Sequence, residues 1–182
     1  MRTLAEETTM YDEIKIMAEI AAEGYDAAEK PFDFVAKGKK TALVCVSDDA
    51  IVPPVINALT TLGCAVVQAG NTRDALRKMR FHLFNHVVVG ENFDTYDPGD
   101  NVVLHYLEGL SMALRRSIFV TFVSNRYRTM DNMMAFNKSV NLIVKRENLG
   151  ELASVLTKAV SENDAFYHVF TELAADLGRS SL

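Results

Sequence analysis

The sequence predicts an α/β fold in which a five-stranded, doubly wound parallel sheet is covered by helices on both faces. The first observation is size, because 182 residues, 49% hydrophobic and 24% charged, are enough for one globular domain with an extension. The second is a series of short, continuous apolar runs, which are typical of strands buried on both faces. The third is that segments of helical periodicity separate these runs, as in parallel sheets with helices on both faces.

The first strand and the first helix of the sheet domain follow one another closely. Thr41–Val46 is a continuous apolar run that ends in Ser47, Asp48 and Asp49, which predicts a buried strand. Pro53–Leu62 is predicted to be a helix, because a proline stands near its start and Gly63 follows its end.

The remaining elements continue this alternation. Apolar runs predict four more strands, over Cys64–Ala69, His86–Val89, Ile118–Val123 and Val140–Val144. Helical periodicity predicts helices over Thr72–Phe81, Asp100–Arg115, Met130–Phe136 and Glu147–Glu162. Thr72 is the expected N-cap of its helix.

The segments outside the sheet domain, which spans 41–162, are predicted to be helical at both ends. Residues 1–30 form an expected acidic amphipathic helix, with apolar residues at Met10, Ile14, Met17, Ala21 and Tyr25. Residues 31–40 form the expected linker, since Pro31 ends the helical pattern. Residues 163–182 form a predicted C-terminal helical extension. The pattern in 1–30 fits a docked or dimerising helix as well as a plain arm.

The distribution of charge and the length of the apolar runs indicate which classes of partner and which cell compartment to expect. The net charge is −5, and residues 1–30 account for all of it with eight acids and three bases. A strongly basic face for nucleic acid or a polybasic membrane anchor is therefore not expected. No apolar run approaches the roughly 20 residues of a membrane helix, and no secretory leader is recognisable. Cys45 and Cys64 lie in apolar runs, as reduced core cysteines do, so we expect a cytoplasmic protein.

The ends of the predicted strands are where ligands should gather, because parallel sheets bind beyond the carboxyl ends of their strands. The residues there are Ser47–Asp49, Gly90–Asp94, Ser124–Asn125 and Lys145–Arg146. No glycine-rich phosphate loop follows the first strand, so dinucleotide and nucleoside triphosphate binding are not expected.

Several segments resemble the receiver domain of response regulators over about residues 40–162. In order along the chain they are Ala42–Asp49, Leu62–Gly63, Val66–Ala69, Asp74–Leu76 and Leu142–Lys145. Three further segments resemble a group of bacterial receiver-like proteins, namely Met79–His82, Met112–Arg116 and Arg128–Ile143. The resemblance implies a flavodoxin-like receiver fold and a role in two-component signal transduction.

The resemblance also implies a phosphorylation site at the carboxyl ends of the strands. In receivers an aspartate after the third strand takes the phosphoryl group, and two acids after the first strand hold Mg²⁺. The acid pair falls on Val46 and Ser47, with Asp48 and Asp49 just after, unless the loop is one or two residues shorter. The acceptor position falls on Gly90.

The other matched positions give a mixed picture. Glu91 follows the acceptor position, while Ser124 and Lys145 match the hydroxyl and the lysine that bind phosphoryl oxygens in receivers. The residue after the lysine, often proline in receivers, is Arg146. We therefore expect a pseudo-receiver with no catalytic residues and no cofactor, whose degenerate site comprises Asp48, Asp49, Gly90, Glu91, Ser124 and Lys145.

Two alternatives remain open at the site. One is a phosphoacceptor regulator that binds Mg²⁺ at Asp48 and Asp49 and uses an off-register acceptor such as Asp94. The other is a small-anion-binding domain that uses Ser124 and Lys145. A structural interpretation also exists for the acids, since Asp48 and Asp49 suit the cap of the first helix.

The histidines and the basic residues outside the candidate site do not predict a catalytic or metal site. His82 and His86 span a helix-to-strand transition, so no metal site is expected. The basic residues form either solvated faces or a patch for an acidic partner, which includes the acidic N-terminal segment. They are Arg73, Arg77, Lys78, Arg80, Arg115, Arg116, Arg126 and Arg128.

A methionine-rich segment is the candidate partner surface. Met130, Met133, Met134 and Phe136 lie on one short predicted helix, where they form either core or an adaptable binding surface. In receivers the corresponding region is the usual dimer and partner face. We expect a non-enzymatic signalling module that binds another protein and forms a homodimer.

Overall fold

The computed structural model of the chain describes residues 15, 18–19, 38–95 and 101–180. Apart from residues 15 and 18–19, the predicted helix over 1–30 lies outside the described residues, as does most of the predicted linker over 31–40.

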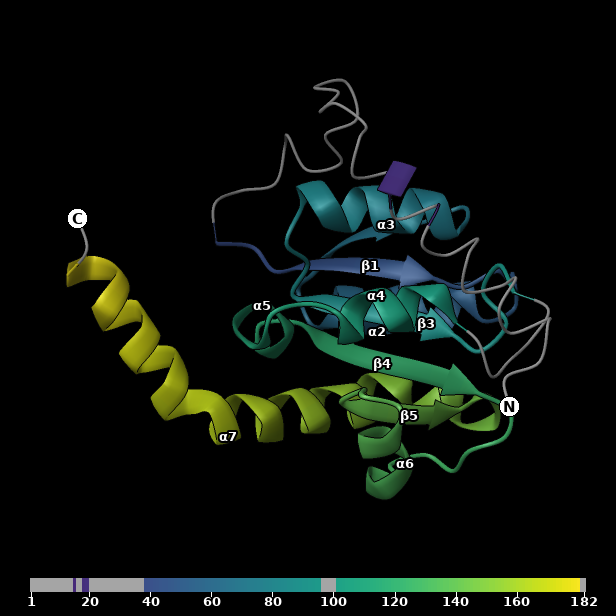
Figure 1. The fold of residues 1–182 in the computed structure, drawn as a ribbon. Coiled ribbons are helices and arrows are strands. Elements are labelled where there is room, and N and C mark those ends of the chain that lie inside the picture. Colours follow the sequence, from purple (N-terminus) through teal and green to yellow (C-terminus); the bar gives the residue numbers. More distant parts are fainter. Residues whose placement is uncertain (1–14, 16–17, 20–37, 96–100, 181–182) are drawn as a thin grey trace.

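The described chain folds around a five-stranded, wholly parallel sheet, as predicted (Figure 1). The strand order is β2-β1-β3-β4-β5. The strands are β1 (Thr41–Cys45), β2 (Ala65–Gln68), β3 (His86–Gly90), β4 (Phe119–Ser124) and β5 (Leu142–Lys145). Each begins and ends within two residues of its predicted run.

Helices cover both faces of the sheet. They are α2 (Val52–Thr61), α3 (Thr72–Phe81), α4 (Val102–Glu108), α5 (Met112–Arg116), α6 (Asn132–Asn137), the 3₁₀ helix η2 (Arg146–Glu151) and α7 (Leu152–Ser180). Helices α2 and α7 pack on one face with Val44 and Val88, while α3, α4 and α6 pack on the other with Leu43 and Val87. Neighbouring residues of a strand thus serve opposite faces.

The interiors of β3 and β4 leave no surface for a ligand. Every residue of β3 and β4 is buried, and the apolar residues on both sides belong to the two core clusters. Cys45 and Cys64 are buried free thiols, and burial raises the pKa of each. Functional side chains must therefore lie at the ends of the strands or on the helices.

The predicted single helix over Asp100–Arg115 is wrong, because two helices stand there. Asn101 starts α4 by accepting a hydrogen bond from the Leu104 amide, and the chain turns at Gly109. The Ser111 hydroxyl then accepts a hydrogen bond from the Leu114 amide and starts α5. Local side-chain capping overrides the continuous apolar periodicity.

Two other helix boundaries differ from the prediction. The N-cap of α3 is Asn71, whose side chain accepts a hydrogen bond of 2.9 Å from the Asp74 amide, so Thr72 is the first helical residue and not the cap. The predicted helix Glu147–Glu162 and the predicted extension are one helix, α7, preceded by η2. No glycine or proline interrupts residues 152–177. The last turns of α7 extend beyond the sheet (Figure 1).

Within the described residues, no helix combines the length and the apolar character needed to cross a bilayer.

Candidate functional site

A small cavity of about 180 Å³ lies at the carboxyl ends of β1, β3 and β4, where the sequence places the candidate site. The ends of these strands and the loops after them line it, together with the first residue of η2; the lining includes Val46, Asp48, Gly90, Glu91, Ser124 and Arg146. Four of the six predicted site residues, Asp48, Gly90, Glu91 and Ser124, therefore come together. Asp49 and Lys145 do not line the cavity.

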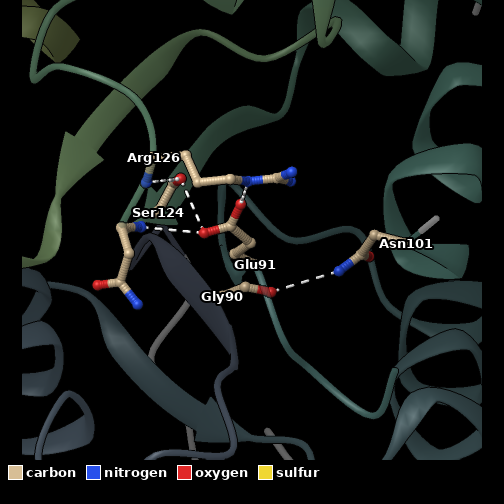
Figure 2. Close-up of polar contacts among 6 residues, drawn as sticks. Gly90, Glu91, Asn101, Ser124 and Arg126 are labelled. Carbon is tan, nitrogen blue, oxygen red and sulfur yellow. Dashed lines mark hydrogen bonds and ion pairs between the residues drawn. The ribbon is translucent and has the colours of Figure 1, made fainter. Parts of the chain in front are cut away.

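The Glu91 carboxylate is the centre of the polar contacts in this region (Figure 2). Its side chain is only 6% exposed, and its Oε2 accepts hydrogen bonds from the Ser124 hydroxyl at 2.9 Å and the Asn125 amide at 3.0 Å. Its Oε1 forms an ion pair with Nε of Arg126. A buried carboxylate needs such donors, because an unpaired charge is costly to remove from water. Both carboxylate oxygens are thus engaged within the chain.

The Ser124 hydroxyl has both of its hydrogen-bonding roles filled. It donates to Glu91 and accepts a hydrogen bond of 3.0 Å from the Arg126 amide. The Cζ atom of the Arg126 guanidinium also lies 5.4 Å from the ring centroid of Tyr127. The loop after β4 is therefore folded around the Glu91 side chain.

Gly90, at the predicted acceptor position, is the last residue of β3. Its carbonyl accepts hydrogen bonds from the Phe93 amide at 3.1 Å and from Nδ2 of Asn101 at 3.3 Å, the latter drawn in Figure 2. A Cβ added at Gly90 would lie 3.5 Å from Cγ2 of Val46, an ordinary van der Waals contact. The backbone thus has room for a Cβ atom here, beside an apolar neighbour.

Asp48 belongs to the turn before α2. Its Oδ1 accepts a hydrogen bond of 2.9 Å from the Ala50 amide, and its Oδ2 lies 2.6 Å from a guanidinium nitrogen of Arg146. The N-cap position of α2 is Ile51, which makes no side-chain capping bond. Asp48 binds the turn that leads into α2, where its carbonyl accepts hydrogen bonds from the Ile51 and Val52 amides. Asp49 is exposed.

Lys145 and Asp94 are used elsewhere. The Lys145 ammonium lies 2.8 Å from Oε2 of Glu147, and its amide donates to the Thr129 hydroxyl. Asp94, the off-register acceptor of the phosphoacceptor alternative, has a φ of 50° and accepts a hydrogen bond of 2.8 Å from the Thr72 amide. It fixes the start of α3 and does not line the cavity.

The charges around the cavity are balanced pair by pair. Glu91 faces Arg126, and Asp48 faces Arg146. Mg²⁺ is held through oxygen ligands, usually one or two carboxylates free to coordinate it. In the part of the chain that the structure describes, no three His, Cys, Asp or Glu side chains are grouped to hold a metal. The two carboxylates that line the cavity, Glu91 and Asp48, are thus each paired with an arginine.

His86 lies far from this chemistry, at the amino end of β3. It is buried, neither ring nitrogen has a hydrogen-bond partner, and its ring contacts that of Phe119. Burial lowers the pKa of His86 to about 4, and nearby Lys40 acts in the same direction. His86 is therefore neutral at neutral pH.

The methionine-rich segment divides between surface and core. Met133 is 78% exposed and Phe136 is 83% exposed, while Met130 is 39% exposed. Met134 packs against the core cluster beneath α3 and α4. The exposed members form an apolar surface on and beside α6.

Sequence reasoning missed the two arginines that balance the site. Arg126 was one of several basic residues assigned to a solvated or partner-binding face, although its guanidinium binds Glu91. The signal for Arg146 was its replacement of the usual proline after Lys145. Arg73 does meet an acid of the N-terminal segment, since its Nη2 lies 3.2 Å from Oε2 of Glu19.

Comparison with known proteins identifies the fold. No protein-family model matches the chain, and no curated protein sequence matches it. Solved structures do match. A CheY-like response regulator receiver domain protein from Methanospirillum hungatei JF-1 is 19% identical with a TM-score of 0.52, covering 70% of this chain and 98% of that chain.

Two further structures agree with the first. A response regulator from Thermotoga maritima is 20% identical with a TM-score of 0.50, covering 68% of this chain and 98% of that chain. The chemotaxis response regulator CheY4 of Vibrio cholerae is 15% identical with a TM-score of 0.52, covering 66% and 98%. At these identities the likeness concerns architecture alone. The described domain has the fold of response-regulator receiver domains.

Proposed function

We propose that the chain is a receiver-like signalling module of the cytoplasm that acts through protein–protein contacts, without phosphorylation of an aspartate and without catalysis. The observation that carries this proposal is the Glu91 carboxylate, which takes the Ser124 hydroxyl and two further donors. In receivers the equivalent hydroxyl binds a phosphoryl oxygen.

The chemistry of phosphoryl transfer argues in the same direction. Transfer to an aspartate needs an acceptor carboxylate and a cation that neutralises the developing charge. Gly90 supplies no carboxylate, and Val46 and Ser47 stand at the positions of the acid pair. Asp48 is already paired with Arg146. The loop after β4 is tied to Glu91 by two hydrogen bonds and an ion pair.

The exposed side chains on α6 support a role in protein binding. Met133 and Phe136 present unbranched and aromatic apolar groups to solvent, and flexible methionines suit partner surfaces that adapt to their ligand. The partner we propose is another protein.

Thermal unfolding with Mg²⁺ and beryllofluoride, a phosphoryl mimic, tests the proposal. A ligand that binds only the native state at 100 times its Kd adds about 2.7 kcal/mol, which raises the Tm of a chain this size by roughly 5–10 °C. We expect no such shift in the parent or in an Asp48→Asn, Asp49→Asn double variant. A shift in the parent that the double variant lacks would establish the phosphoacceptor alternative instead.

Thermal unfolding with inorganic phosphate tests the small-anion alternative. Arg146 lines the cavity, so an anion that bound there would compete with Asp48 for its guanidinium. We expect inorganic phosphate without Mg²⁺ to leave the Tm within the range given by equal ionic strength of chloride. A phosphate-specific rise that Arg146→Met abolishes would favour the anion-binding function.

A further inference from the structure

The C-terminal half of α7 carries an apolar stripe that the sheet domain does not cover. Its members are spaced by three and four residues, so they lie on one face of the helix. They are Phe166, Val169, Phe170 and Leu173, with exposed fractions of 80%, 65%, 40% and 58%. We propose that this stripe pairs with the same stripe of a second copy of the chain, with the two helices antiparallel.

The stripe is distinct from the face of α7 that binds the sheet. Leu152, Leu156 and Val160 are buried in the core beneath α7. At 100° per residue, their row is offset from the stripe by roughly a quarter turn of the helix. Figure 1 shows the last turns of α7 beyond the sheet edge. Phe166, Val169 and Leu173 therefore form a surface separate from the core row, while Phe170, about five full turns after Leu152, lies at the edge of the stripe toward that row.

A helix in this position gains from a partner. Isolated helices shorter than about 12–15 residues are marginal in water, and most helical stability comes from packing an apolar face. Two of the four stripe residues also lie beside the domain. Cζ of Arg116 lies 5.0 Å from the ring centroid of Phe170, and Phe166 lines an open cavity together with Phe119 and Leu142. Burying the stripe of two copies removes on the order of 1,000 Å² in total, near the lower end for specific interfaces.

The pattern of the stripe is its own complement under a two-fold axis. An axis between positions 169 and 170 places Phe166 opposite Leu173 of the other copy, and Val169 opposite Phe170. Such an isologous contact closes on itself as a dimer. The antiparallel direction also separates the acids, because a parallel pair would set Glu162 beside Glu162 and Asp176 beside Asp176.

Charge argues against the acidic N-terminal segment as the occupant. Residues 1–30 carry a net charge of −5, and Glu162, Glu172 and Asp176 lie on the exposed part of α7. These like charges repel. Glu19 instead forms its ion pair with Arg73 of α3.

Sedimentation of the full chain over a range of concentrations tests the pairing. We expect a dimer in the parent, and a roughly 30-fold or greater rise in the dimer Kd in Val169→Glu, as for loss of a central interface residue. Ser161→Glu adds the same charge to an exposed position on the other side of α7 and should leave the dimer unchanged. A monomeric parent, or a dimer that Val169→Glu does not weaken, would overturn the proposal.

Disulfide trapping tests the direction of the helices. Under mild oxidation by copper–phenanthroline, a mixture of Phe166→Cys and Leu173→Cys chains should cross-link, while each variant alone should not. The native thiols Cys45 and Cys64 are buried and give little background. Cross-linking of Phe166→Cys to itself, without the mixed product, would show a parallel pair and overturn the antiparallel arrangement.

Discussion

Replacement of Glu91 by alanine should destabilise the domain far more than loss of a typical surface acid. The variant removes the acceptor for the Ser124 hydroxyl and the Asn125 amide, and removes the partner of Arg126. A buried donor left without an acceptor costs roughly 1–3 kcal/mol. Ser124 is 2% exposed, so its hydroxyl has little access to water in compensation.

The ion pair adds less to this cost than the buried donors do. The Arg126 side chain is half exposed, and pairs in such surroundings contribute at most about 1 kcal/mol. Relief from burying the Glu91 carboxylate offsets part of the loss. The sum is a destabilisation of about 2–4 kcal/mol, which lowers the Tm by roughly 4–16 °C.

Urea unfolding with a two-state fit measures this change. The matched control is Glu147→Ala, since Glu147 also pairs with a cation but is 75% exposed, and its loss should change stability by less than about 0.5 kcal/mol. Ser124→Ala in both backgrounds gives a double-mutant cycle, for which we expect coupling of about 1–2 kcal/mol between Ser124 and Glu91. A loss below about 1 kcal/mol in Glu91→Ala, or additivity in the cycle, would refute this reasoning.

Three further predictions concern other buried polar groups. Since the pKa of His86 is about 4 when folded and about 6.5 when unfolded, the unfolded chain binds more protons between these values, so stability is lost as pH falls from 6.5 to 4. The loss attributable to His86 is roughly 3 kcal/mol, and urea titrations should show it in the parent but not in His86→Leu. Asn101→Ala removes the cap of α4 and a donor to Gly90, and should cost about 1–2 kcal/mol by the same titration; an unchanged midpoint would contradict it. Cys45 should resist iodoacetamide in the folded chain and react on unfolding, and mass spectrometry that found rapid native labelling would contradict its burial.

The sheet could be predicted from the sequence because parallel strands buried on both faces leave a simple signal. Val87, Val88 and Val89 are all apolar since each faces a core, and β1 and β5 show similar buried apolar runs. The single predicted helix over Asp100–Arg115 failed for a local reason. The Ser111 hydroxyl competes for a backbone amide and starts a new helix, which periodicity does not reveal.

The position of the candidate site can be predicted from the sequence, but the ion-pair partners of its acids cannot. The ends of β1, β3 and β4 do enclose a cavity, because parallel strands end at one edge. The partners of its acids were not predictable, since Arg126 lies 35 residues from Glu91 and Arg146 lies far from Asp48 in sequence. Which of several arginines meets an acid depends on loop conformation, and sequence spacing does not determine that.

The space around Gly90 means that a phosphoacceptor side chain could be introduced into this domain by substitution. A Cβ fits there beside Val46 in ordinary van der Waals contact, so the backbone at this position accommodates a residue other than glycine. Substituting Gly90→Asp together with Val46→Asp and Glu91→Ala would install an acceptor and an acid while removing the carboxylate that accepts the hydrogen bond of the Ser124 hydroxyl. The parent and this triple variant would then differ in three side chains at one edge of the sheet. The two proteins can be used as matched baits in affinity purification. A partner that binds the parent equally with and without a phosphoryl donor should bind the triple variant in a way that depends on the donor.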